Sequence, residues 1–383
     1  DPKASHVIPA VMKCFFEAKQ NNLETIEIWG TGEPLREFIY VDDIVMEGSQ
    51  TVDQAKEKIQ NIFNELQTDP STLIMWTSIV LAVTGLIVGK GLKNGLERAV
   101  TYAMPTMFVL LLVIAGYAAL NGDFAKTIEF MFYPDFSKLT FSGVLIALGH
   151  AFFTLSLASG AMMIYGAYLP QKTSISQSVV AIAIADTVIA LIAGLAIYPI
   201  VFGNGLEATA GPGLVFVSLP IAFGQMWGGI VFGTLFFVML GFAAFTSAIA
   251  MVESAVAWLV ERLAFSRGKA AFTAVISLWF VSMLTVFSFT GAEWAKLDFV
   301  FVGKHVSNYF ELIDHLTADV LLPLGGLATA VFVAWIMQKE AVKQELNLSE
   351  GLFNLWYVTL RWFTPVAVLF VFLNLIGLMS FGS

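Results

Sequence analysis

Apolar stretches of about 20 residues recur along the chain from residue 70 onward. A helix rises about 1.5 Å per residue, so each stretch can cross a hydrocarbon core of about 30 Å. The stretches lack the polar–apolar alternation of barrel strands, and a lipid-exposed backbone must satisfy its own hydrogen bonds. The pattern predicts an all-α polytopic membrane protein with eight transmembrane helices, near residues 72–90, 98–120, 143–169, 174–202, 229–264, 268–290, 311–338 and 354–379.

The first 70 residues follow a different pattern. Residues 48–70 carry apolar side chains at helical spacing between polar ones, which predicts an extramembrane helix ending at Pro70. Residues 1–43 predict a short α/β soluble fragment, too small to bury a core of its own. We therefore expect three parts: the fragment at 1–43, a seam and loop helix at 44–70, and a transmembrane domain at 71–383.

Composition sharpens this division. Hydrophobic residues make up 57% of the chain and charged residues 13%, whereas about a quarter of residues are charged in soluble proteins. The first 70 residues alone carry −7 of the net charge of −9. An acidic chain without a basic stripe excludes a nucleic-acid partner. The single cysteine, Cys14, excludes an internal disulfide and a thiolate metal cluster.

The basic residues predict the orientation of the spans, because cytoplasmic loops are enriched in Lys and Arg. One set of alternate loops and their flanks holds four basic residues: Lys126, Lys138, Lys296 and Lys304. The other set holds ten: Lys90, Lys93, Arg98, Lys172, Arg262, Arg267, Lys269, Lys339, Lys343 and Arg361. We expect the loops around Asn94, Lys172, Arg267 and Lys343 to be cytoplasmic, and the segment before the first span to lie outside.

Small and hydroxylated residues gather in the middle of the third span, over Phe152–Gly160. A helix can be broken at such a place, so that freed backbone groups face a cavity. In the fifth span, Thr246 and Ser247 stand among small neighbours and offer the hard oxygen ligands that suit a monovalent cation. The alternatives are a small-residue packing face in the third span and hydroxyls bonded back to the i−4 carbonyl in the fifth.

Ionisable residues at membrane depth point to function, because a charge near the bilayer centre costs at least about 2.5–3.5 kcal/mol. Asp186 lies within an apolar run and needs a cation, a proton or a basic partner. Glu253 is also surrounded by apolar residues, but no partner is identifiable. His150 has two interpretations: a packing residue that forms a hydrogen bond, or a proton relay.

Five motifs in order resemble the neurotransmitter:sodium symporter family, in its bacterial amino-acid transporter branch with eleven or twelve spans. They are Lys90–Arg98 leading into Met104-Pro105, Phe152–Ser156, Ala185–Thr187 leading to Ala193–Ile197, Gly211–Phe216 and Phe245–Ala250. The resemblance covers about residues 48–383. It implies the inverted-repeat amino-acid transporter fold, truncated, with the eight spans matching the family's fourth to eleventh.

The resemblance also implies residue roles. Two sodium sites would draw on Thr154 and Asp186, and on the carbonyl of Ala243 with the hydroxyls of Thr246 and Ser247. An Asp at position 186 resembles the chloride-independent variant, in which a fixed carboxylate replaces the anion. The amino-acid substrate would be lined by Phe153, Ser156, Ser159, Ser247 and Met251, with Phe153 as an aromatic lid and Asp314 as the acidic half of an outer gate.

Residues 1–43 resemble a C-terminal portion of GDP-L-fucose synthase, an NADP-dependent enzyme. The match rests on Ser5–Ala10, Ile28–Phe38 and Val41–Asp43, and places His6 near the cofactor with Lys13, Trp29 and Arg36 near the sugar nucleotide. The fragment lacks a Gly-rich phosphate loop and a Tyr-x-x-x-Lys pair, so we expect no enzyme activity from it. We interpret the chain as a join of two unrelated coding fragments near residues 44–47.

The resulting hypothesis is a truncated multi-pass symporter of the plasma (inner) membrane, which couples sodium flow to uptake of a neutral amino acid by alternating access. The expected partners are the amino acid and the lipid bilayer, and the sequence predicts no oligomeric state. An inactive chimeric fragment is the first alternative, because unpaired polar residues are costly in lipid. A membrane-anchored oxidoreductase of the GDP-L-fucose synthase type is the second.

Overall fold

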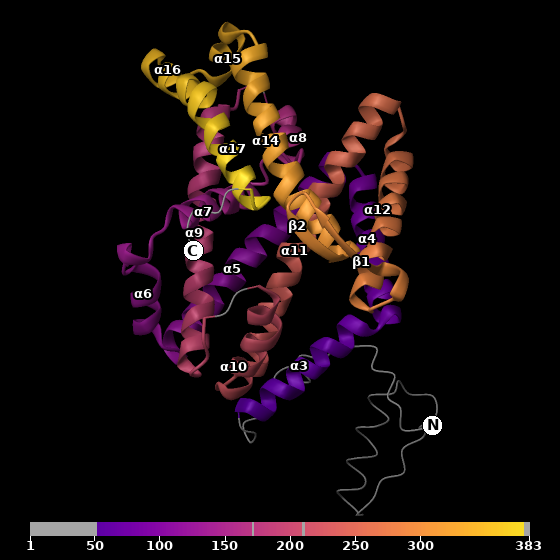
Figure 1. Ribbon diagram of the computed structural model, residues 1–383, viewed down its shortest axis with the longest axis vertical. Coiled ribbons are helices and arrows are strands. Elements are labelled where there is room, and N and C mark those ends of the chain that lie inside the picture. The colour runs from indigo at the N-terminus through magenta and orange to yellow at the C-terminus, as the bar shows by residue number, and fades with distance from the viewer. Residues whose placement is uncertain (1–51, 171, 209–210, 379–383) are drawn as a thin grey trace, which may run out of the picture. The chain divides into compact units, whose positions relative to one another are not determined.

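The computed structural model describes residues 52–170, 172–208 and 211–378. The predicted α/β fragment at 1–43 and the predicted seam at 44–47 lie outside the described residues. The predicted extramembrane helix is present as α3 (Val52–Thr68), drawn in indigo in Figure 1. Its buried Ile59 packs against Ile221 of the short helix α10 (Leu219–Gln225), which ties α3 to the loop that follows the fourth predicted span.

Within the described part of the chain, seven helical spans are long and apolar enough to cross a membrane. Only 11–22% of the residues in their most apolar windows are buried within the protein, so the exposed apolar side chains need lipid around them. The spans are α4 (Pro70–Gly89), η1 (Leu92–Glu97) with α5 (Arg98–Asn121), α9 (Ile175–Gly203), α11 (Gly229–Leu263), α12 (Arg267–Phe289), α13 (Tyr309–Asp314) with η5 (His315–Leu321), α14 (Leu322–Val331) and η6 (Phe332–Ile336), and α16 (Glu350–Val358) with η7 (Thr359–Phe363) and α17 (Thr364–Leu375).

The boundary between α3 and α4 shows why the first span begins where it does. Pro70 occupies the first turn of α4, where a missing N–H costs no hydrogen bond. Asp69 caps the helix, and its carboxylate accepts from the Ser71 amide at 3.0 Å and the Thr72 hydroxyl at 2.5 Å. The hydroxyl is the main reason that the pKa of Asp69 lies below its usual value.

The third predicted span is broken, which is one of the two interpretations that the sequence left open. It consists of α7 (Phe141–Thr154) and α8 (Ala161–Tyr168), separated by residues 155–160. Neither half is long enough to cross the membrane by itself. The eight predicted spans therefore correspond to seven long helical spans and this interrupted one.

Several short elements between the spans are additional to those predicted. The helices are α6 (Phe124–Phe132), η2 (Phe136–Lys138), η3 (Leu214–Ser218), α10, η4 (Glu293–Ala295) and α15 (Lys339–Leu346). Strands β1 (Lys296–Phe301) and β2 (Lys304–Asn308) form an antiparallel hairpin, the one sheet among the described residues. The predicted class is all-α, and the hairpin is a small addition to it.

The turn of the hairpin requires a glycine. Val302 and Gly303 have φ angles of 44° and 84°, the positive values that a two-residue hairpin turn of type I′ demands at both positions. A Cβ at Gly303 would lie 1.8 Å from the carbonyl oxygen of Ile376, just beyond α17. The turn therefore packs backbone to backbone against the end of the last described span.

Two buried apolar clusters hold the spans together. One joins α5, α9, α10 and α11, around Ile114, Ile200, Leu219 and Phe223. The other joins α4, α11 and α12, around Val88, Ile249, Val256 and Ala270. The long helix α11 contributes to both, and Figure 1 shows α4 and α12 side by side near it.

Contacts between loops show which ends of the spans share a side. Arg267, at the start of α12, donates to the carbonyl of Val88 at the end of α4 (3.0 Å). Ser176, at the start of α9, donates to the carbonyl of Leu346 at the end of α15 (2.7 Å). Both bonds join loops that belong to the set rich in basic residues. Loops of one set lie on the same side of the membrane when successive spans alternate in direction. That this side is cytoplasmic stays a prediction.

Candidate functional site

The break in the third span contains three positive backbone angles within five residues. The φ angles are 51° at Ser156, 65° at Ala158 and 86° at Gly160. Left-handed backbone costs about 1–2 kcal/mol per non-glycine residue, so packing must hold the break. A Cβ at Gly325 of α14 would lie 3.0 Å from the Cβ of Ala158, and one at Gly160 would lie 3.5 Å from the Cβ of Ser254 on α11. The break therefore lies between α14 and α11.

The break brings the first pair of predicted sodium ligands together. Thr154, the last residue of α7, places its hydroxyl 3.2 Å from Oδ2 of Asp186 on α9. Thr154 Oγ1 also lies 3.5 Å from the carbonyl of Ala151. Asp186 lies about 17 Å along α9 from its first residue, at 1.5 Å per residue. A hydroxyl and a carboxylate at this depth offer the hard oxygen ligands that an alkali cation binds.

The second set of predicted sodium ligands lies on one turn of α11. Thr246 Oγ1 donates to the carbonyls of Phe242 and Ala243, both at 3.0 Å, and Ser247 Oγ donates to the Ala243 carbonyl at 3.0 Å. These are the back-bonds of the alternative interpretation. They also gather two hydroxyl oxygens around one carbonyl oxygen, which is a partial set of hard ligands.

The predicted substrate residues lie on the break and on α11. Ser159 Oγ donates to the carbonyl of Ser156 at 2.8 Å, which closes a turn inside the break. Ser247 and Met251 are four residues apart and share one face of α11. Phe153 and Met251 are 60% and 55% exposed. The predicted lining residues therefore do not form a closed cavity among the described residues.

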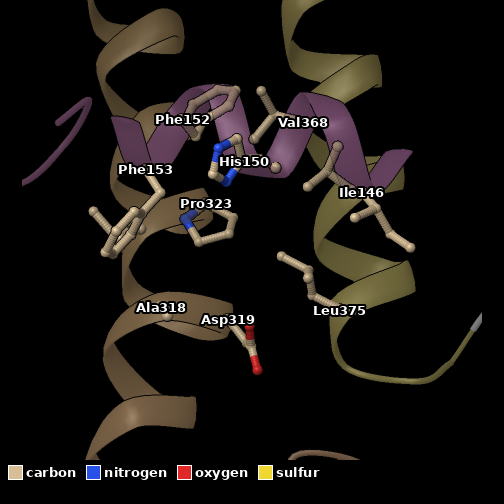
Figure 2. A pocket seen from close by; sticks show the side chains of 12 residues that line it. Ile146, His150, Phe152, Phe153, Ala318, Asp319, Pro323, Val368 and Leu375 are labelled. Carbon is tan, nitrogen blue, oxygen red and sulfur yellow. The ribbon is translucent and has the colours of Figure 1, made fainter. Parts of the chain in front are cut away.

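The structure shows a pocket that the sequence did not predict. It lies between α7, the η5–α14 stretch and α17, and has a volume of about 260 Å³. Figure 2 shows His150 of α7 above Pro323, with Asp319 further along. Phe153, the predicted lid, forms part of the wall. The full lining is Ile146, Gly149, His150, Phe152, Phe153, Ala318, Asp319, Leu322, Pro323, Val368, Val371 and Leu375.

Asp319 also belongs to a polar network, centred on the buried His315, that fastens the hairpin. His315 is 0% exposed. Its Nδ1 lies 2.7 Å from Asp319 Oδ2, and its Nε2 lies 3.1 Å from the carbonyl oxygen of Phe301, in the hairpin. Lys304 Nζ lies 3.6 Å from the same carboxylate oxygen. Because a carbonyl oxygen only accepts, Nε2 carries a proton. The sequence offers one signal for this pair: His315 and Asp319 are four residues apart, a spacing that places two side chains on the same helix face.

Asp314, the predicted acidic half of an outer gate, precedes His315 in the chain. It is exposed and forms no ion pair with a described residue. Its carbonyl accepts the Thr317 hydroxyl at 3.2 Å. The gate assignment stays a prediction.

Glu253, which the sequence left without a partner, forms an ion pair with Arg267. Glu253 is 1% exposed and Arg267 is 26% exposed. The Tyr168 hydroxyl lies 3.5 Å from the other carboxylate oxygen, so residues of α8, α11 and α12 meet here. The pair lies at the end of the spans that is rich in basic residues, away from Asp186 at mid-span.

The comparison with known families decides the identity of this architecture. Residues 49–381 match the sodium:neurotransmitter symporter family. The chain belongs to this family. The resemblance predicted from the five motifs is confirmed over the same part of the chain, and membership implies a multi-pass membrane protein that depends on sodium.

Three similar proteins define the relationship. The uncharacterized sodium-dependent transporter YhdH of Bacillus subtilis is 33% identical over 325 residues, which cover 84% of this chain and 70% of that protein. An uncharacterized sodium-dependent transporter of Haemophilus influenzae is 31% identical over 83% of this chain and 69% of its own length. The crystal structure of MhsT in complex with L-phenylalanine gives a TM-score of 0.75 at 33% identity, over 87% of this chain and 73% of that one.

The first part of the chain has a separate relationship. Residues 1–64 match the NAD dependent epimerase/dehydratase family. A stretch of 43 residues is 58% identical to GDP-L-fucose synthase 1 of Arabidopsis thaliana, but covers 11% of this chain and 13% of that enzyme. The predicted resemblance is confirmed for this short segment. Over most of its length this symporter-family chain has transporters, not enzymes, as homologues.

Proposed function

We propose that the chain belongs to a symporter that couples sodium entry to uptake of a neutral amino acid by alternating access. One observation carries the proposal: the hydroxyl of Thr154, at a break in a membrane helix, faces the carboxylate of Asp186 at 3.2 Å. A carboxylate at mid-span is costly in lipid unless a cation or a proton neutralises it. A sodium ion beside the break would do so and would bind close to the freed backbone groups.

We propose two sodium sites. The first uses Thr154 and Asp186, and the second uses the carbonyl of Ala243 with the hydroxyls of Thr246 and Ser247. Because Asp186 already supplies a fixed negative charge, we propose that the transporter does not require chloride.

We propose a neutral amino acid as substrate. The residues assigned to its binding, Phe153, Ser156, Ser159, Ser247 and Met251, supply apolar surface and hydroxyls but no charge to pair with a charged side chain. The similarity to MhsT, whose crystal structure contains L-phenylalanine, supports a ligand of this class.

Each proposed site is incomplete among the described residues. Sodium takes more ligands than the two or three oxygens present at either site, and the exposed side chains of Phe153 and Met251 leave the substrate region open. We propose that further helices supply the rest, and that this chain alone does not complete transport. Its location would be the plasma membrane, with the loops around Asn94, Lys172, Arg267 and Lys343 in the cytoplasm.

Sodium binding by the full chain in lipid nanodiscs tests the proposal. We expect sodium chloride, compared with choline chloride, to raise the midpoint of thermal unfolding, because an ion that binds the folded state stabilises it. Asp186→Asn removes the charged ligand and should abolish the shift. Thr187→Ala is the matched control: among the described residues its hydroxyl bonds only to the carbonyl of Ala183, at 2.9 Å, so the shift should remain.

Uptake is measured separately. We compare the full chain with a version extended before residue 48 by the three spans that the family resemblance places there, both in liposomes with an inward sodium gradient. Sodium-driven uptake of L-phenylalanine or another neutral amino acid by the extended version supports the proposal. No uptake of any common amino acid by that version, together with no sodium shift in the first experiment, would contradict it.

A further inference from the structure

Arg361 is the one basic residue in the 26-residue span Glu350–Leu375. It lies in η7, where α16 and α17 join, next to the end of the η6 stretch. A guanidinium does not lose its proton in a protein, so this span carries a permanent positive charge. The sodium and substrate sites proposed above do not use it.

Three aromatic rings surround the guanidinium. Its central carbon lies 4.7 Å from the ring centre of Trp335, 5.9 Å from that of Tyr357 and 6.0 Å from that of Trp362. The rings of Trp335 and Trp362 meet edge to face at 5.3 Å. We call these three rings and Arg361 the aromatic cage. The faces of the rings attract the cation.

The cage lacks an anion. The Nε atom of Arg361 is buried and has no hydrogen-bond partner, and no described carboxylate lies within 4.0 Å of the guanidinium. The acidic group that begins the same span, Glu350, instead pairs with Lys343 at 2.7 Å. A buried N–H group without a hydrogen-bond partner is energetically unfavourable, and the aromatic rings do not accept a conventional hydrogen bond from it, so an external anion would stabilise this site.

The position of the cage identifies the source of that anion. Trp335 is the next-to-last residue of its span, and Trp335 and Trp362 are 50% and 57% exposed. A partly exposed Trp near a span end, such as Trp335, is typical of the membrane–water interface. Lys339, just beyond the span end, places its ammonium 5.2 Å from the same Tyr357 ring. The cage therefore opens toward lipid at the level of the headgroups, with a second cation on its aqueous side.

We propose that the aromatic cage binds the phosphate group of a phospholipid. The forked N–H groups of a guanidinium match two phosphate oxygens at once, and Lys339, which contacts the same Tyr357 ring, would add a second positive charge nearby. The exposed rings of Trp362 and Phe363 (69% exposed) offer apolar surface to the acyl chains. A free phosphate ion has no such contact, which favours the lipid as the source.

Native mass spectrometry of the full chain, released from detergent micelles, tests the proposal. The probes are dioleoylphosphatidylglycerol, dioleoylglycerol, which has the same chains but no phosphate, and inorganic phosphate. We expect the chain to retain the phospholipid and not dioleoylglycerol. Arg361→Gln should weaken retention about tenfold, and Arg361→Lys less, because an ammonium keeps the charge but loses the two-pronged hydrogen bond.

Arg262→Gln is the matched control, because it removes an exposed guanidinium from the last turn of α11, outside the cage. Retention by this variant should equal that of the original chain. Equal retention of dioleoylglycerol, or unchanged retention by Arg361→Gln, overturns the proposal. If millimolar inorganic phosphate displaces the bound phospholipid as effectively as added phospholipid does, the lipid is not the source of the bound phosphate group. If Arg361→Gln does not fold, unchanged retention by Arg361→Lys is the overturning result.

Discussion

Single ionisable residues in the membrane spans have partners far from them in the chain. Asp186 meets Thr154 at a separation of 32 residues, and Glu253 meets Arg267 of the next span. Placing a charge at the bilayer centre costs about 2.5–3.5 kcal/mol or more, so a hydrophobicity pattern can identify such residues as important. The identity of the partner depends on how the helices pack.

The pair of Glu253 and Arg267 leads to the first prediction. Glu253→Ala removes the carboxylate partner of the Arg267 guanidinium, which also donates to the Val88 carbonyl at 3.0 Å. Removing one member of a buried ion pair typically costs about 3–5 kcal/mol. Because Arg267 is 26% exposed, water offsets part of this, and we expect a loss near the lower end.

The measurement is the midpoint of thermal unfolding in detergent, and the control is Glu293→Ala. Glu293 pairs with Lys296 at 2.7 Å, but it is 87% exposed, and surface pairs contribute about 0–1 kcal/mol. The Glu253 variant should unfold several degrees lower than this control. Equal midpoints for the two variants would show that the buried pair is not structurally important.

At the scale of elements, the broken span has no regular helix over residues 155–160. The left-handed backbone angles of Ser156 and Ala158 are energetically unfavourable. The hydroxyl of Ser159 and the packing of α11 and α14 stabilise the break. Small residues let α14 and α11 approach the break closely, so the packing-face interpretation and the broken-helix interpretation both describe the same segment.

Gly160 gives a prediction for this element. Gly160→Ala places a Cβ 3.5 Å from that of Ser254, an ordinary contact, but the residue must keep a φ of 86°. We expect destabilisation of about 1–2 kcal/mol from the backbone alone. Gly166→Ala, in the regular helix α8 with nothing within 4 Å of its new Cβ, should instead stabilise by about 0.5–1 kcal/mol. Thermal unfolding of both variants gives the comparison, and shifts of the same sign would be inconsistent with strain at the break.

At the scale of the whole described part, the hairpin connects α12 to the seventh predicted span and packs against the end of the eighth. The buried ring of His315 bonds to the hairpin carbonyl of Phe301 on one side and to Asp319 on the other. Asp319 also lines the pocket of Figure 2. The hairpin, one wall of the pocket and a membrane span are therefore mechanically connected through one side chain.

His315→Leu tests this connection. It removes the imidazole that donates to the Phe301 carbonyl and bonds to the Asp319 carboxylate, and losing a hydrogen bond to a charged group typically costs about 1.5–3 kcal/mol. We expect amide hydrogen exchange in β1 and β2 to become at least about tenfold faster, because local opening becomes easier. His305→Leu is the control: His305 lies on the same hairpin, but it is 57% exposed and pairs with the exposed Asp298. Unchanged exchange in the His315 variant would contradict the connection.

The sequence by itself determined the features that depend on local pattern. Length and hydrophobicity defined the spans, clustered small residues made a break in the third span one of two interpretations, and ordered motifs identified the family. Residue type alone marked Asp186 and Glu253 as ionisable groups that need partners. These features depend on neighbours along the chain, so one sequence contains the information for them.

Only the tertiary structure decided which distant groups meet. It paired Glu253 with Arg267, fastened the hairpin through His315 and formed the pocket between three spans. It also left Arg361 among aromatic rings without an anion. In a membrane protein nearly every span is apolar on all sides, so hydrophobicity does not specify which face packs against which helix. Close contacts between small residues and a few buried polar bonds make that choice, and these form only when the helices have assembled.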